Sequence, residues 1–169
     1  GYEWRQEFSR GYAISEVEQV RPLDEGEVTG TRVTFKPDAQ IMETTIFNYD
    51  TLETRFRQMA YLVKGVMIRL VDERIAPIPN ELSFYFEGGV PSFVRYLNRN
   101  RNELHKVVGG GGEFKFKYML EGKELDGLML IDFAVQYADT TNTLEMAFAN
   151  TINTADGGTH LTGMRTAIT

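Results

Sequence analysis

The feature that most constrains this fold is an apolar run in the last third of the chain, from Leu128 to Tyr137. Its apolar side chains share one face of an extended chain, and Asp132 and Gln136 fall on the other. The residues of the apolar face are Met129, Ile131, Phe133, Val135 and Tyr137. This alternation predicts a central strand of a sheet, followed by a second strand from Thr143 to Ala149.

The composition limits what kind of protein can carry this strand. A chain of 169 residues suits one domain or slightly more, and 42% hydrophobic with 25% charged residues is typical of soluble globular proteins. No apolar stretch reaches the roughly 18 residues of a membrane span, and no signal-peptide pattern is present, so we expect no membrane contact. The absence of cysteine excludes disulfides and thiolate metal sites and fits a cytoplasmic location.

The net charge bears on nucleic-acid binding. At −6, it argues against a protein whose whole surface binds DNA or RNA. Any contact with DNA must therefore be made by a local basic patch.

The first half of the chain contains two alternating runs. Tyr2 to Phe8 alternates apolar and charged residues, as does Thr31 to Phe35, where Pro37 ends the run because proline cannot donate to a strand ladder. We predict that the two runs form antiparallel neighbouring strands. The polar stretch from Ser15 to Gly26 is expected to be a loop or an edge strand.

The middle of the chain predicts two helices and a hairpin. Asn48 or Asp50 can cap a helix that ends near Lys64 and Gly65, since apolar residues recur at helical spacing. Strands are expected from Val66 to Leu70 and from Leu82 to Phe86, joined by a turn at residues 76–80. A second amphipathic helix, residues 90–97, tolerates Pro91 in its first turn.

The glycine run Gly109 to Gly112 predicts a mobile connection, since it lacks the Lys-Ser/Thr of a phosphate-binding loop and precedes a strand. In that strand, Phe114, Phe116 and Tyr118 alternate with lysines, which predicts one core face and one basic face. We expect a turn over residues 121–127. A closing helix should start at a cap, Asp156 or Thr159, and share the apolar residues Leu161, Met164, Ala167 and Ile168 on one face.

The residue pattern contains no recognisable active site. His105 and His160 are the only histidines, and neither has the spacing of a metal-binding pair. His160 follows two glycines and could carry a proton or contact an anion, but a helix start with close backbone approach is the favoured interpretation. Asp132 could act as an acid or base, yet a surface position is favoured. We therefore predict no catalytic residue and no metal ligand.

Three separated motifs are shared with one family in the same order. They are T-G-T-R-V-T-F-K-P-D at residues 29–38, F-E-G-G-V-P-S-F-V-R-Y-L-N at residues 86–98, and F-A-N-T-I-N-T-A-D-G-G-T-H-L at residues 148–161. Together they resemble the B subunits of bacterial DNA gyrase, a type II topoisomerase. The resemblance covers nearly the whole chain.

The resemblance implies an α+β fold with two parts. Residues 1–45 would be the C-terminal strands of an incomplete GHKL ATP-binding domain. Residues 46–169 would be a transducer domain, truncated at its C-terminal side. Its expected architecture is a two-layer α/β sandwich resembling the fold of ribosomal protein S-five domain two.

The resemblance also implies site residues. Thr31 matches a family threonine that helps hold adenine, and Val33 matches a wall residue of the same pocket. Arg165 occupies the family's basic position after G-G-T-H and is the best candidate for DNA binding, with Lys115 and Lys117 as weaker ones. Ordinary strand or surface roles remain open for all five residues.

The family's catalytic elements lie outside the matched stretches. Its magnesium and water-activating residues precede the first motif, and its Gln-Thr-Lys loop follows the last. The whole enzyme would use ATP and Mg²⁺, act on double-stranded DNA with a gyrase A subunit, and form a homodimer through its ATPase region. This chain alone is expected to bind no cofactor and to be inactive.

Three alternatives remain open at the level of sequence. The B-type subunit of topoisomerase IV shares most of the motifs. A mismatch-repair protein of the MutL type shares the pairing of GHKL and transducer domains, although the E-G-G and G-G-T-H strings favour a topoisomerase. An independent α/β binding protein is the third possibility.

Overall fold

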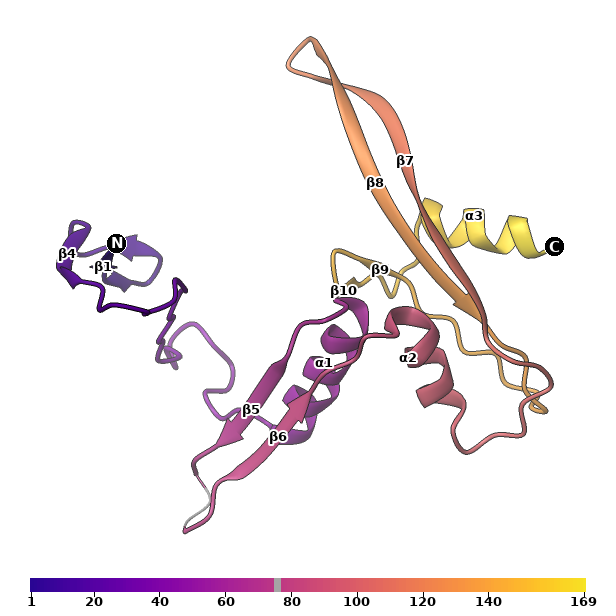
Figure 1. Cartoon of the computed structure of the whole chain (residues 1–169), viewed down its shortest axis with the longest axis horizontal. Coiled ribbons are helices and arrows are strands. Elements are labelled where there is room, and N and C mark those ends of the chain that lie inside the picture. The colour runs from indigo at the N-terminus through magenta and orange to yellow at the C-terminus, as the bar shows by residue number, and fades with distance from the viewer. Residues whose placement is uncertain (75–76) are drawn as a thin grey trace. The chain divides into compact units, whose positions relative to one another are not determined.

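The fold is taken from a computed structural model, which describes residues 1–74 and 77–169. Figure 1 shows the whole chain as a cartoon. It divides into two compact units, Gly1–Phe47 (unit 1) and Asn48–Thr169 (unit 2). The elements mix helices and strands, as the predicted α+β class requires.

Unit 1 is built from two short antiparallel pairs. Its strands are β1 (Tyr2–Arg5), β2 (Phe8–Ser9), β3 (Tyr12–Ala13) and β4 (Glu18–Pro22). β1 pairs with β4, and β2 pairs with β3 around a turn at Arg10 and Gly11, which both have positive φ. Arg21 of β4 holds the outer pair through Glu3 on β1, with 2.9 Å between Nε and Oε2. The polar stretch from Ser15 to Gly26 was expected to be a loop or an edge strand, and it contains the strand β4.

The strand predicted from Thr31 to Phe35 is wrong. The structure assigns no regular element to these residues, and β1 takes β4 as its partner instead. β4 is closer along the chain, so pairing with it closes a shorter loop at lower entropic cost. Val33 is 78% exposed and Phe35 is 68% exposed. The alternation of apolar and polar residues predicts which side chains share a face, but it does not provide a strand to pair with.

Unit 2 begins with α1 (Tyr49–Leu62), and the side chain of Asn48 caps it. The Asn48 Oδ1 atom accepts a hydrogen bond from the Thr51 amide at 2.9 Å, which confirms one of the two predicted caps. α1 packs against a hairpin of β5 (Ile68–Asp72) and β6 (Asn80–Phe84). Their shared core contains Ala60, Leu70 and Phe84. The helix and hairpin are confirmed, while part of the expected turn at residues 76–80 lies outside the described residues.

The second predicted helix is α2 (Gly89–Asn98), with Pro91 in its first turn. It is joined to α1 by aromatic packing, since the Tyr61 ring stacks on Phe86 at 3.6 Å and lies 5.2 Å from the Phe93 ring, measured between centroids. These rings fix α2 beside α1 and the β5–β6 hairpin. The arrangement places helices against strands, as expected for an α/β two-layer architecture.

The longest element is a hairpin of β7 (Val108–Leu120) and β8 (Lys123–Val135). Figure 1 shows the two strands as long, twisted arrows that run side by side and are joined by a turn at one end. The predicted central strand lies in β8, but among the described residues β8 pairs only with β7, so its central position is wrong. The turn consists of Glu121 and Gly122 alone, and the wider turn predicted for residues 121–127 is therefore wrong as well.

The glycine run is not a mobile connection. Gly109 to Gly112 belong to β7 and pair with residues 131–134 of β8. A Cβ on Gly109 would come within 2.9 Å of the Pro91 ring, and one on Gly111 within 2.3 Å of the Asp132 carboxylate. Glycine therefore permits the close approach of α2 and β8 to β7. The four glycines in the sequence do not by themselves reveal these neighbours.

The C-terminal elements are short. β9 (Phe148–Ala149) pairs with β10 (Ile152–Asn153), so only the end of the strand predicted from Thr143 forms. α3 (Thr159–Ile168) is confirmed as the closing helix, but its N-cap is Gly158, without a side-chain hydrogen bond. The predicted caps Asp156 and Thr159 are wrong, because Gly157 and Gly158 take positive φ and turn the chain directly into the helix.

Candidate nucleic-acid interface

Two candidate DNA-binding lysines lie on the same face of β7. Lys115 pairs in register with Leu128, and Lys117 with Asp126. The Lys117 ammonium donates to Glu124 Oε2 at 2.8 Å, so its charge is partly balanced. Lys115 forms no ion pair within the described part of the chain. It is therefore the lysine more available to an external anion.

The opposite face of β7 is not the buried core predicted for it. The rings of Phe114, Phe116 and Tyr118 follow one another, with centroid distances of 6.4 and 5.9 Å. Phe114 is nevertheless 56% exposed and Tyr118 42% exposed. The hairpin thus carries an exposed aromatic row on one side and the lysines on the other.

Arg165 lies in the last turn of α3. Its guanidinium Nε donates to Glu145 Oε2 at 2.9 Å, and its NH2 group bonds the same oxygen. This hydrogen bond raises the pKa of Arg165 above its ordinary value. Because both partners are solvent-exposed, the pair is easily exchanged for another anion.

The segment before α3 positions that helix. Asn150 and Thr151 form the β9–β10 turn with positive φ, and the Arg55 guanidinium of α1 donates to the Thr151 carbonyl at 2.9 Å. His160 Nε2 lies 3.0 Å from Thr154 Oγ1. This contact agrees with the favoured interpretation of His160 as part of a helix start.

Arg55 and Glu145 contact the candidate interface but were not predicted from the sequence. Helical spacing predicts only that Arg55 lies off the apolar face of α1, and its partner Thr151 is 96 residues away. Glu145 falls in the part of a predicted strand that does not form. Neither position carries a local signal, because each acts through a contact between distant segments.

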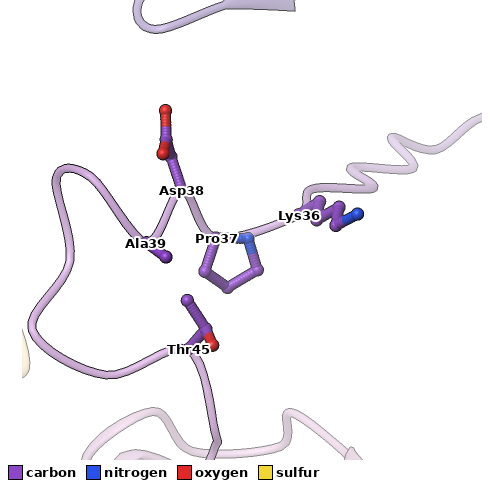
Figure 2. A pocket seen from close by; sticks show the side chains of 5 residues that line it. All are labelled: Lys36, Pro37, Asp38, Ala39 and Thr45. Atoms are coloured by element: carbon purple, nitrogen blue, oxygen red, sulfur yellow. The ribbon is translucent and has the colours of Figure 1, made fainter.

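The two candidate nucleotide residues lie in unit 1. Thr31 and Val33 are exposed and lie in a segment without regular structure. A nearby open hollow is lined by Lys36, Pro37, Asp38, Ala39 and Thr45. Figure 2 shows Pro37 and Thr45 turned toward each other there, with Lys36 and Asp38 pointing away. Neither candidate lines this hollow, and their roles in nucleotide binding stay a prediction.

Metal-binding groups and membrane-spanning helices are also absent from the described residues. In residues 1–74 and 77–169, no three His, Asp or Glu side chains come together in a group able to hold a metal ion. Within the same ranges, no helix is long and apolar enough to cross a bilayer.

Comparisons with known proteins agree across the whole chain. Residues 89–169 match the family model described as DNA gyrase B. The chain is 43% identical over 169 residues to the DNA gyrase B protein of Clostridium acetobutylicum, covering 100% of this chain and 24% of that protein. It is 36% identical to the DNA topoisomerase 4 B protein of Bacillus subtilis, again over 100% of the chain.

A solved structure gives the same assignment. The 43K ATPase domain of Thermus thermophilus gyrase B, determined in complex with an aminocoumarin, is similar with a TM-score of 0.66 and 32% identity. The match covers 99% of this chain and 42% of that one. The chain spans about a quarter of the length of the curated relatives it matches. The family model over residues 89–169, the identity along the whole chain and the fold all show similarity to DNA gyrase B.

Proposed function

We propose that this chain serves within the ATPase region of a type II DNA topoisomerase, as part of a gyrase B protein. There it couples ATP binding and hydrolysis to DNA strand passage and supercoiling. The observation that carries the proposal is the whole-chain match to gyrase B, whose 43K ATPase domain shares the fold. The alternative is the B protein of topoisomerase IV, which matches with lower identity.

The two units would have different roles in the full protein. In this proposal, unit 1 belongs to the end of the GHKL domain and unit 2 to the transducer. Thr31 and Val33 would supply only part of a nucleotide site, and the chain would transmit the effect of ATP and Mg²⁺ bound in the full protein. That protein would act on double-stranded DNA with gyrase A in the cytoplasm and dimerise through its ATPase region.

A chimeric enzyme tests the coupling role. The matching segment of Clostridium acetobutylicum gyrase B is replaced by this chain and combined with gyrase A of that organism. We expect ATP-dependent supercoiling to be retained, because the segment supplies the same connection between nucleotide and DNA. A folded chimera that binds an ATP analogue but passes no strand would contradict the proposal.

Within unit 2, Arg165, Lys115 and Lys117 are the proposed DNA contacts. Lys115 is unpaired in the described residues, Lys117 pairs with Glu124, and Arg165 pairs with Glu145. All three are exposed, so phosphate oxygens can replace the carboxylates. The net charge of −6 means that binding by the whole chain should be weak and sensitive to salt.

Titration of a fluorescent DNA duplex at low salt tests these contacts. Arg165→Ala and Lys115→Ala should each weaken binding and reduce the salt slope by about 0.9 for every phosphate that the variant no longer neutralises. Glu145→Gln should strengthen binding, since it releases Arg165 from its carboxylate partner. Lys106→Ala removes a lysine outside the proposed patch and serves as the control. An equal loss of affinity for Lys106→Ala and Lys115→Ala would show that only overall charge matters.

A further inference from the structure

The outer edge of β7 has no partner strand in the described part of the chain. β7 pairs with β8 along all 13 of its residues, and within that part no backbone hydrogen bond joins its other edge to any segment. Such an edge presents a row of free amide and carbonyl groups, which a second strand can pair with. The edge is long enough to specify a partner.

The sequence of β7 is complementary to itself in an antiparallel register. Phe114 is the middle residue of Val108–Leu120, so a two-fold axis there pairs every residue with one in a second copy. In that register Glu113 lies opposite Lys115 of the second copy, and Lys115 opposite Glu113. Both charge pairs fall on the face away from the aromatic row.

Size is complementary in the same register. The four glycines Gly109, Gly110, Gly111 and Gly112 lie opposite Met119, Tyr118, Lys117 and Phe116 of the second copy. Large side chains thus cover the bare backbone of the glycines, an arrangement that stabilises glycine within strands. The rows of Phe114, Phe116 and Tyr118, in which Phe116 is half-buried, would join into one continuous apolar face.

The edge of β8 lacks this complementarity. Its centre is Met129, and a two-fold axis there places Asp126 opposite Asp132 of the second copy on both sides. Like charges directly opposite one another destabilise a strand pair. The self-complementary edge is therefore specific to β7.

We propose that a second copy of this chain binds along the outer edge of β7, in the antiparallel register centred on Phe114. The two hairpins then form a four-stranded sheet in the order β8, β7, β7 and β8. This interface is separate from the dimerisation proposed for the ATPase region of the full protein. It brings the two aromatic rows side by side on one face and places the glycines opposite larger side chains.

Charge exchange tests the register by sedimentation or light scattering over a concentration series. Lys115→Glu and Glu113→Lys each place like charges opposite one another twice, and each should raise the dimer dissociation constant about tenfold or more. The double variant E113K/K115E restores both pairs and should recover dimerisation. Lys123→Glu makes the same charge change on β8 and should leave the dimer intact. A monomeric native chain, or no recovery in the double variant, overturns the proposal.

Cross-linking tests which edge is used, since the native chain contains no cysteine. In the proposed register the two Phe114 positions face each other at a spacing that a disulfide can bridge. Phe114→Cys should form a disulfide dimer under mild oxidation. Met129→Cys, its neighbour across the hairpin and the centre of the β8 edge, should not. Cross-linking through Met129→Cys, or none through Phe114→Cys, contradicts the β7 interface.

Discussion

Asp72 is a buried carboxylate whose ionisation is linked to the stability of the fold. It ends β5, and its Oδ1 accepts hydrogen bonds from the Arg74 amide at 3.0 Å and the Arg74 Nε at 2.8 Å. These bonds lower the pKa of Asp72 from 3.8 to about 2. The ionised form is therefore the one that stabilises the folded state.

This linkage predicts a pH-dependent contribution to stability. The folded pKa lies below the unfolded one, so the contribution is full above pH 3.8 and is lost as pH falls to about 2. Asp72→Asn should thus lower the free energy of unfolding at pH 6, and its difference from the native chain should vanish near pH 2. Urea titrations across this range measure it. Asp126→Asn, on the exposed part of β8, is the control, and an equal deficit for Asp72→Asn at both pH values would refute the linkage.

Individual residues are predictable where the local pattern matches a regular element. Leu70 and Phe84 fall on the apolar faces predicted for their strands, and Asn48 caps α1 as one of two options. Thr31 and Val33 come from the family resemblance, and their roles in nucleotide binding stay a prediction. The DNA-binding roles of Arg165, Lys115 and Lys117 also stay predictions. The contacts around a charged side chain depend on residues distant in sequence, as Glu145 is from Arg165.

At the scale of elements, the tight turn of the long hairpin sets its register. Glu121 and Gly122 have φ values of 50° and 79°, and positive φ at both central residues is the mark of a type I′ turn. Such a turn matches the twist of the flanking strands. The register of the 13 residue pairs of β7 and β8 thus depends on this turn, and asparagine and glycine are the residues that type I′ turns favour.

Substitutions at this turn should change hairpin stability in opposite directions. Gly122→Ala should cost about 1 kcal/mol, because alanine strains at positive φ, whereas Glu121→Asn should stabilise the turn. Hydrogen exchange of the β7 and β8 amides reports both effects. Gly112→Ala makes the same change at ordinary φ with open space around it and should not weaken protection. Equal loss in the two alanine variants would argue against a type I′ turn.

The elements are easier to predict from sequence than their partners. Helical spacing identifies α1, α2 and α3, since each apolar stripe is local in sequence. The prediction for the glycine run is wrong because its role depends on Pro91 and Asp132, which approach it from other elements. The order of strands is not predictable either, since alternation defines faces and not neighbours.

At the scale of the whole molecule, the two units differ in how they are stabilised. Unit 2 contains a core around α1 and the β5–β6 hairpin, whereas unit 1 leaves Val33 and Phe35 largely exposed. The units divide between Phe47 and Asn48. Their assignment to a GHKL domain, residues 1–45, and a transducer domain, residues 46–169, stays a prediction. A unit with so little core is consistent with a part of a larger domain.

Calorimetric titration with a non-hydrolysable ATP analogue tests the central claim, that this chain transmits the effect of nucleotide and does not bind it alone. The titration is run on this chain and on a version extended toward the N-terminus with the preceding residues of Clostridium acetobutylicum gyrase B. We predict no binding heat for the chain and saturable binding for the extended version. Binding by the chain alone, or none by a folded extended version, would contradict the account.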